Sequence, residues 1–216
     1  MSTFELIGHD IEAYCEEHSS PENGLLHRLN RETHLETINP RMLSGQLQGL
    51  FLTFVSKMLR PQNIVEVGTF TGYSALCLAE GLADGGVLHT IERNVEYEDR
   101  ILDYFGRSPY GESITLHIGD ARRVIPELDT IWDLSFIDAE KEDYGTFYDL
   151  LLPRTRPGGF ILVDNTLWNG KVVGEVARND RDTHAIAQFN DKVQRDVRVR
   201  NLLLPFRDGI MMIEKL

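Results

Sequence analysis

The chain has 216 residues, which suits one domain of moderate size. It is 42% hydrophobic and 26% charged, so it can bury a full core and does not have the composition of a disordered chain. Its net charge of −12 argues against broad contact with nucleic acid or anionic lipid, since both need a basic face. No basic segment followed by an apolar stretch opens the chain, and no apolar run approaches the length of a membrane span. We therefore expect a cytoplasmic protein without membrane contact.

The first sixty residues have the patterns of helices. Helices are predicted over residues 2–18, 19–36 and 45–60. In the first of them Phe4, Ile7, Ile11 and Tyr14 fall on one face. The second starts with Ser-Ser-Pro-Glu, a helix-start signal with proline at the first helical position. We expect residues 1–60 to form a helical cap on a core of residues 61–216, within one domain.

After residue 61 short β-rich runs alternate with helical stretches. The strand candidates are residues 63–68, 86–92, 113–120, 132–139 and 159–165. The helical stretches between them are residues 73–82, 95–107, 122–129 and 144–154. This alternation predicts an α/β fold with a Rossmann-like, doubly wound and mostly parallel sheet. Two strand-like runs around Arg-Asp-Gly, at residues 197–206 and 209–216, predict a closing antiparallel hairpin.

Ligands of such sheets bind beyond the carboxyl ends of the strands. The first strand contains Glu66, an unusual acid in an apolar run, and leads to Gly68 and Gly72, which allow a close backbone approach. This turn lacks the middle glycine of G-x-G-x-x-G, which disfavours a nicotinamide or flavin site. The second strand ends at Glu92, where an acid suits the ribose hydroxyls of an adenosine. A surface charge that caps the next helix is the alternative reading of Glu92.

Side chains with oxygen atoms also follow the fourth and fifth strands, with Asp138 after one and Asp164 and Asn165 after the other. Adjacent parallel strands bring these side chains together, and two packed carboxylates repel unless a cation lies between them. Carboxylate and amide oxygens without Cys or His suit a hard ion such as Mg²⁺, Mn²⁺ or Ca²⁺. An Asp-Asn helix cap or turn is the alternative, and the matching acid on the neighbouring strand favours the metal site.

The chain resembles the cation-dependent class I O-methyltransferases, which include caffeoyl-CoA and catechol O-methyltransferases. The resemblance runs through nearly the whole chain, over the segments YCEEHSSPENGLL, EVGTFTGYSAL, FIDAEKEDY, VDNTLWNGKV and LLPFRDGI. It implies methyl transfer from S-adenosylmethionine to a hydroxyl of a small catechol-like phenol, with a divalent cation (Mg²⁺ first, Mn²⁺ or Ca²⁺ otherwise) and a homodimer. One departure is Glu140, which stands where plant members carry Asp in Asp-Ala-Asp-Lys.

The resemblance also implies roles for single residues. The metal ligands would be Asp138, Asp164 and Asn165. The residues that bind S-adenosylmethionine would be Ser44, Glu66, Gly68, Ser74, Glu92, Ala121 and Asp138. Lys141 would be the catalytic base, and Trp168 and Asn169 would contact the acceptor.

Two other functions stay open. Some bacterial relatives resemble this chain and methylate a hydroxylated uridine in transfer RNA, an activity that the net charge disfavours and a basic pocket rim would favour. A nucleotide-binding oxidoreductase or a non-catalytic binding module on the same fold is the third hypothesis. The missing G-x-G-x-x-G and the Asp138, Asp164 and Asn165 set argue against it. Residues 171–187 match the family by position alone, so the acceptor is not identified.

Overall fold

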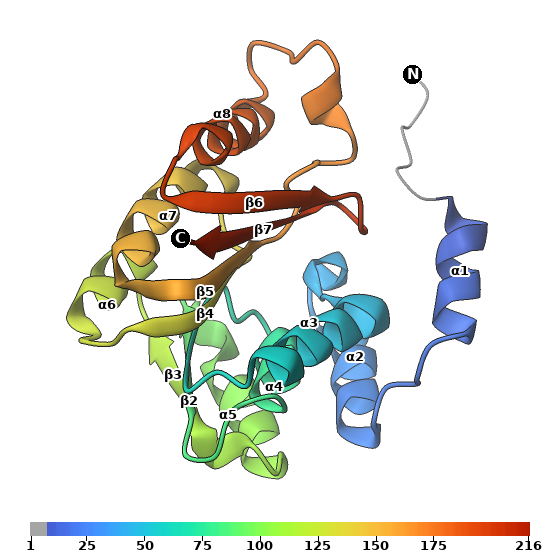
Figure 1. Cartoon of the computed structure of the whole chain (residues 1–216). Coiled ribbons are helices and arrows are strands. Elements are labelled where there is room, and N and C mark those ends of the chain that lie inside the picture. The colour runs from blue at the N-terminus through green and yellow to red at the C-terminus, as the bar shows by residue number, and fades with distance from the viewer. Residues whose placement is uncertain (1–7) are drawn as a thin grey trace.

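The computed structural model describes residues 8–216, and a seven-stranded sheet lies at their centre (Figure 1). The strands are β1 Asn63–Val67, β2 Val87–Glu92, β3 Ile114–Ile118, β4 Trp132–Ile137, β5 Thr155–Val163, β6 Val199–Leu204 and β7 Ile210–Lys215. Their order is β3-β2-β1-β4-β5-β7-β6, with β1 to β5 parallel and β6 and β7 antiparallel. The predicted Rossmann-like, mostly parallel sheet with a C-terminal antiparallel hairpin is confirmed.

Helices cover both faces of this sheet (Figure 1). Those of residues 8–216 are α1 His9–Glu17, α2 Gly24–Glu36, α3 Gly45–Leu59, α4 Tyr73–Ala79, α5 Glu98–Arg107, α6 Ala121–Glu127, α7 Tyr144–Leu151 and α8 Arg181–Arg195. One buried cluster joins α2, α3, α4 and α5 to the face that carries Ile64 and Phe136. A second joins α6, α7 and α8 to the face that carries Val65 and Ile137. Both faces of the strands are therefore buried, as parallel sheets require.

The N-terminal helices differ in detail from the prediction. Helix α2 begins at Gly24, and the Asn23 side chain accepts hydrogen bonds from the amides of Leu25 and Leu26, both at 3.0 Å. The start predicted at Ser-Ser-Pro-Glu was wrong because this cap lies further along the chain. Of the predicted face of the first helix, Phe4 and Ile7 lie outside the described residues. Ile11 and Tyr14 are 60% and 61% exposed, so they do not face the core.

Helix α8 was not predicted from the sequence. Asp180 caps it by accepting a hydrogen bond from the Thr183 amide at 3.1 Å. Its buried side chains Ile186, Phe189 and Val193 recur at helical spacing and pack in the second cluster. Within residues 8–216, no helix is both long enough and apolar enough to span a membrane.

The parallel strands align their carboxyl ends. Ile137 of β4 pairs with Val163 of β5, and the Asp164 amide donates to the Ile137 carbonyl at 3.0 Å. The Asp138 amide likewise donates to the Val67 carbonyl of β1 at 2.9 Å. The residues that follow β1, β4 and β5 therefore lie side by side. The chain reverses its direction of winding between β1 and β4, which is where ligands bind in open α/β sheets.

We propose that the helical cap and the sheet form one cooperative domain. Leu29 of α2 is fully buried in the same cluster as α4 and α5, so Leu29→Ala should lower the free energy of unfolding by about 2–5 kcal/mol. Urea unfolding followed by fluorescence and by circular dichroism should give one coincident transition. The control is Leu35→Ala on the same helix, where 71% of the residue is exposed and the change should stay within about 0.5 kcal/mol. Separate transitions for cap and sheet would contradict the single domain.

Candidate functional site

A cavity of about 1280 Å³ lies at the carboxyl ends of the parallel strands. Each of the five strands contributes to its wall. The wall residues at or just after the ends of β1 to β5 are Gly68, Glu92, Gly119, Asp138 and Asp164. The rest comes from the loops that follow β1, β2, β4 and β5, from the segment before α3 and its first turn, from residues of α4, α6, α7 and α8, and from the turn between β6 and β7.

Most of the residues singled out in the sequence meet in this cavity. Its wall includes Ser44, Gly68, Ser74, Glu92, Ala121, Asp138, Lys141, Asp164, Asn165 and Trp168. Glu66 and Asn169 are not among the lining residues. These side chains come from positions spread along the chain, and the sheet topology brings them together.

At one end of the cavity, Glu92 presents a carboxylate that is held by the backbone. Glu92 is 7% exposed, and its two oxygens accept hydrogen bonds from the amides of Phe70 and Asn94, both at 2.8 Å. Gly68 has a φ of 98°, and a Cβ on it would lie 1.9 Å from the Asp138 carbonyl oxygen. Only glycine allows the β1 and β4 ends to approach so closely. The wall beside Glu92 is therefore rigid backbone.

Glu66 lies behind this wall and is fully buried. The Thr90 hydroxyl donates to its Oε2 at 2.5 Å, while its Oε1 has no partner among the described residues. Burial raises the pKa of Glu66 to about 8, against the opposing effect of hydrogen bonds from Ser74 and Thr90. Ser74 itself lines the cavity, so Glu66 can reach a ligand there through Ser74.

At the other end, Asp164 is 4% exposed and close to Asp138. Burial first, and then the negative charge of Asp138, raise the pKa of Asp164 to about 7. Two donors offset this: Gln48 Nε2 donates to its Oδ2 at 2.7 Å, and the Asn165 amide donates to its Oδ1 at 2.8 Å. Gln48 lies on α3, is 2% exposed and was not singled out in the sequence.

Lys141 supplies positive charge between these oxygens. Its Nζ donates to Asn165 Oδ1 at 2.6 Å and lies 3.3 Å from Asp138 Oδ1. It also lies 5.1 Å from the centre of the Tyr144 ring and 5.6 Å from that of Trp168. The lysine thus contacts two of the three predicted metal ligands and stands beside an aromatic wall of the cavity.

The oxygen atoms at the Asp164 end of the cavity are ligands that fit Mg²⁺ or Mn²⁺. The possible ligand atoms here are the side-chain oxygens of Asp138, Asp164 and Asn165. The negative charge of the two carboxylates already attracts the ammonium group of Lys141. In the described part of the chain no group of three or more His, Cys, Asp or Glu could hold a metal ion. Two carboxylates and an amide suffice for Mg²⁺, which keeps several waters and takes one or two protein carboxylates.

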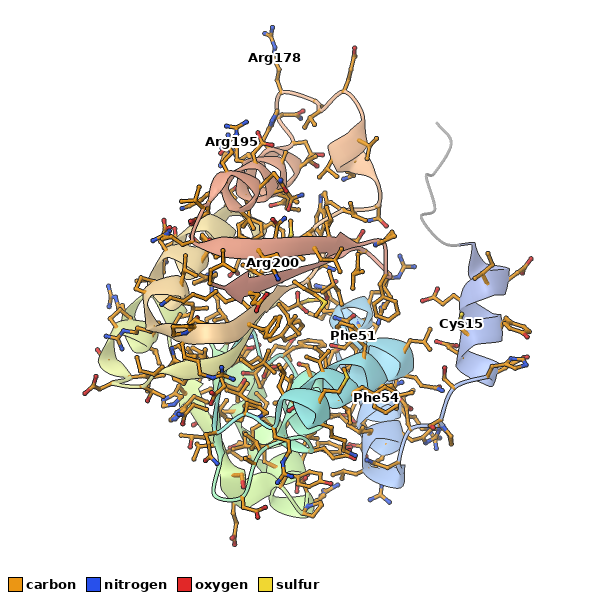
Figure 2. The ribbon with its side chains drawn as sticks, viewed as in Figure 1. Cys15, Phe51, Phe54, Arg178, Arg195 and Arg200 are labelled. Carbon is orange, nitrogen blue, oxygen red and sulfur yellow. The ribbon has the colours of Figure 1, made fainter. Side chains whose placement is uncertain are left out.

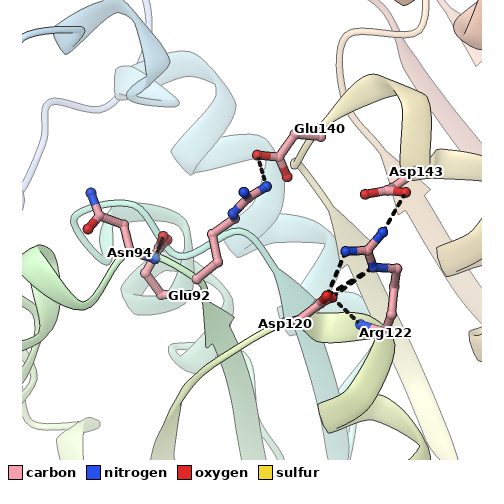
Figure 3. A network of polar contacts seen from close by, with 7 residues as sticks. Glu92, Asn94, Asp120, Arg122, Glu140 and Asp143 are labelled. Atoms are coloured by element: carbon pink, nitrogen blue, oxygen red, sulfur yellow. Dashed lines mark hydrogen bonds and ion pairs between the residues drawn. The ribbon is translucent and has the colours of Figure 1, made fainter.

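Ion pairs connect the loops at the cavity rim (Figure 3). Arg93, after β2, pairs with Glu140, after β4, at 2.5 Å. Arg122 of α6 pairs with Asp120 at 2.6 Å and lies 3.6 Å from Asp143. The longer side chain of Glu140 therefore points to Arg93. These groups are largely exposed, so the pairs contribute little to stability.

Comparison with known proteins identifies the chain. The sequence profile of the O-methyltransferase family matches residues 16–216. The chain belongs to the O-methyltransferase family. It is 33% identical over 180 residues to the Dictyostelium discoideum protein named "Probable caffeoyl-CoA O-methyltransferase 2", covering 81% of this chain and 78% of the relative. It is 31% identical over 191 residues to the caffeoyl-CoA O-methyltransferase of Mesembryanthemum crystallinum, covering 81% and 73%.

The fold agrees with that of a methyltransferase of known structure. The SAH-bound Podospora anserina methyltransferase PaMTH1 superposes with a TM-score of 0.88 at 27% identity, over 96% of this chain and 94% of that one. The chain is thus an S-adenosylmethionine-dependent O-methyltransferase, and the resemblance seen in the sequence is confirmed. This membership decides against an oxidoreductase or a non-catalytic binding module.

Proposed function

We propose that this O-methyltransferase methylates one hydroxyl of a small catechol-like acceptor and uses a divalent cation held by Asp138, Asp164 and Asn165. The observation that carries the proposal is the buried Asp164 carboxylate beside Asp138, at a cavity edge where the possible metal ligands are oxygen atoms. The names of the relatives, two of which are caffeoyl-CoA O-methyltransferases, support a phenolic acceptor.

S-adenosylmethionine would occupy the end of the cavity that contains Glu92. The Glu92 carboxylate uses one lone pair of each oxygen for a backbone amide, which leaves acceptor capacity for the two ribose hydroxyls. Ala121 begins α6 at the same end and would lie by the adenine. Ser44, Gly68 and Ser74 would contact the methionine part, with Glu66 behind Ser74. Asp138 would lie between cofactor and ion.

The acceptor would lie between Trp168 and the ligand oxygens. A free phenol has a pKa of roughly 10, so little of it is ionised near neutral pH. A bound divalent ion would supply positive charge that favours the ionised hydroxyl. Lys141 would take the proton that the hydroxyl loses only as a neutral amine, so its ammonium group, which contacts Asp138 and Asn165, would first give its own proton to solvent. Trp168 and Asn169 would orient the ring, and much of the rate would come from this positioning.

We also propose a homodimer. Large apolar side chains of α1 and α3 are exposed, with Ile11 at 60%, Tyr14 at 61%, Phe54 at 56% and Met58 at 76%. Figure 2 shows Phe51 and Phe54 along α3. Several large exposed apolar side chains on neighbouring helices favour a contact with another protein.

For the cofactor, Glu92→Ala should weaken S-adenosylmethionine binding by roughly tenfold to a hundredfold, since a hydrogen bond to a charged group contributes about 1.5–3 kcal/mol. Calorimetry on the folded variant measures this loss. Glu96→Ala, which removes an exposed acid four residues further on, should bind like the wild type. Unchanged affinity in Glu92→Ala would refute the assignment to the ribose.

For the metal, EDTA treatment should abolish methylation of a catechol but leave S-adenosylmethionine affinity within about twofold, because the Glu92 contacts do not involve the ion. Mg²⁺ or Mn²⁺ should restore turnover, whereas Zn²⁺ should do so poorly for lack of N or S ligands. Asp164→Asn keeps the shape but loses a charge, so it should need a higher Mg²⁺ concentration. Asp99→Asn on the exposed side of α5 is the control. Full activity of metal-free enzyme would show that the Asp-Asn pair is only a turn.

For the dimer, light scattering at micromolar concentration should give twice the monomer mass of 24.7 kDa. Phe54→Asp with Met58→Asp should shift the mass toward the monomer, because each places a charge in the apolar contact. A wild-type mass of one chain at all these concentrations would count against the dimer.

A further inference from the structure

The segment Asp164–Gly170, here called the acceptor loop, has an unusual backbone. Asn165, Trp168 and Asn169 have φ values of 57°, 49° and 51°. Residues with a Cβ disfavour this left-handed region, so such a loop persists only where its surroundings hold it. Asparagine tolerates this region, so the strain lies mainly at Trp168, the bulky residue of the three and a proposed acceptor contact.

Two residues of the turn between β6 and β7 hold this loop. Asp208 and Gly209 together accept hydrogen bonds from four consecutive loop amides, those of Thr166, Leu167, Trp168 and Asn169. The Gly209 carbonyl accepts the first at 3.0 Å, and the Asp208 carbonyl accepts the second and third at 2.9 Å and 3.3 Å. The Asp208 carboxylate Oδ1 accepts the fourth. The sequence predicted this turn at Arg-Asp-Gly but gave none of its residues a role in the site.

The turn and the loop also match in shape. Gly209 has a φ of 92°, and a Cβ on it would lie 2.6 Å from the Leu167 amide nitrogen. That distance is too short for any side chain, so the loop backbone packs directly on the turn. The hairpin of β6 and β7 therefore acts as a template for the loop (Figure 1).

We propose that Asp208 is a positioning residue for the acceptor. Its carboxylate fixes the Asn169 amide and with it the left-handed conformation of Trp168 and Asn169, so that the loop presents Asn165 and Trp168 to the cavity. The inference rests on the proposed function, because it takes this end of the cavity as the place of acceptor and ion. The hydrogen bonds that hold Glu92 come from Phe70 and Asn94 and not from this turn, so S-adenosylmethionine binding should not depend on the Asp208 carboxylate.

The kinetic test compares Asp208→Ala with Asp208→Asn. The alanine variant should raise the catechol KM and the Mg²⁺ activation constant by roughly tenfold to a hundredfold, as expected for the loss of one hydrogen bond to a charged group. The asparagine variant keeps an acceptor oxygen and should restore most of both constants. S-adenosylmethionine affinity by calorimetry should stay within about twofold in both variants. Asp191→Ala, an exposed acid on α8, should match the wild type throughout.

Two kinetic outcomes would overturn the proposal. If Asp208→Asn raises the two constants as much as Asp208→Ala does, the charge of Asp208 acts directly on the acceptor or the ion and not through the loop. If Asp208→Ala weakens cofactor binding as much as acceptor binding, the residue serves the fold in general. Unchanged constants in Asp208→Ala would also refute it.

A second readout needs no turnover. The chain has two tryptophans, and Trp132 is fully buried, so acrylamide quenching reports mainly on Trp168. Quenching should increase in Asp208→Ala, remain at the wild-type level in Asp208→Asn, and nearly vanish in Trp168→Phe. If the wild type methylates no catechol, the proposed function fails but the quenching still tests the loop. Equal quenching in wild type and Asp208→Ala would contradict the positioning role.

Discussion

The convergence of Asp138 and Asp164 is the constraint around which this site is built. Because Ile137 and Val163 are register partners, the residues that follow them lie side by side. Burial of Asp164 next to a like charge raises its pKa to about 7, although three neighbours favour the ionised carboxylate. Gln48 of α3 and the Asn165 amide donate hydrogen bonds to it, and the Lys141 ammonium group adds a nearby positive charge.

The two ends of the cavity are built by different means. At the cofactor end, strand ends and glycine turns bring backbone amides to the Glu92 carboxylate, and a Cβ at Gly68 would clash with the Asp138 carbonyl. At the acceptor end, a strained loop is held by Asp208 and Gly209. The first arrangement belongs to the sheet itself, whereas the second depends on contacts with the C-terminal hairpin. Changes in the hairpin can therefore alter acceptor binding while the cofactor site stays the same.

The sequence predicted the features that depend on strand order. Alternating β and α patterns define a parallel sheet, and parallel strands place Asp138, Asp164 and Asn165 at one edge. It could not predict partners that are joined only by tertiary packing. Gln48 is 116 residues from Asp164, and its sequence context is that of an apolar helix.

Other differences come from competing local signals. Asn23 caps α2 although Ser-Ser-Pro-Glu stands before it. In α8 charged residues outnumber the buried stripe of Ile186, Phe189 and Val193, which obscured its helical period. Glu66 does not line the cavity, because strand alternation points it under α4, and its contact with the cofactor stays a prediction.

The most direct test of the metal site is the binding of Mn²⁺ to the isolated protein, measured as the loss of the free-ion signal in electron paramagnetic resonance. We predict one ion bound per chain, displaced by Mg²⁺, and binding weakened at least about tenfold when Asp164 becomes Asn, because one charged ligand is lost. A protein in which Asp138 and Asp164 are both Asn should bind no Mn²⁺ at this site. If the wild type leaves the free-ion signal undiminished, or if the double variant binds Mn²⁺ as well as the wild type, the two carboxylates do not form a metal site.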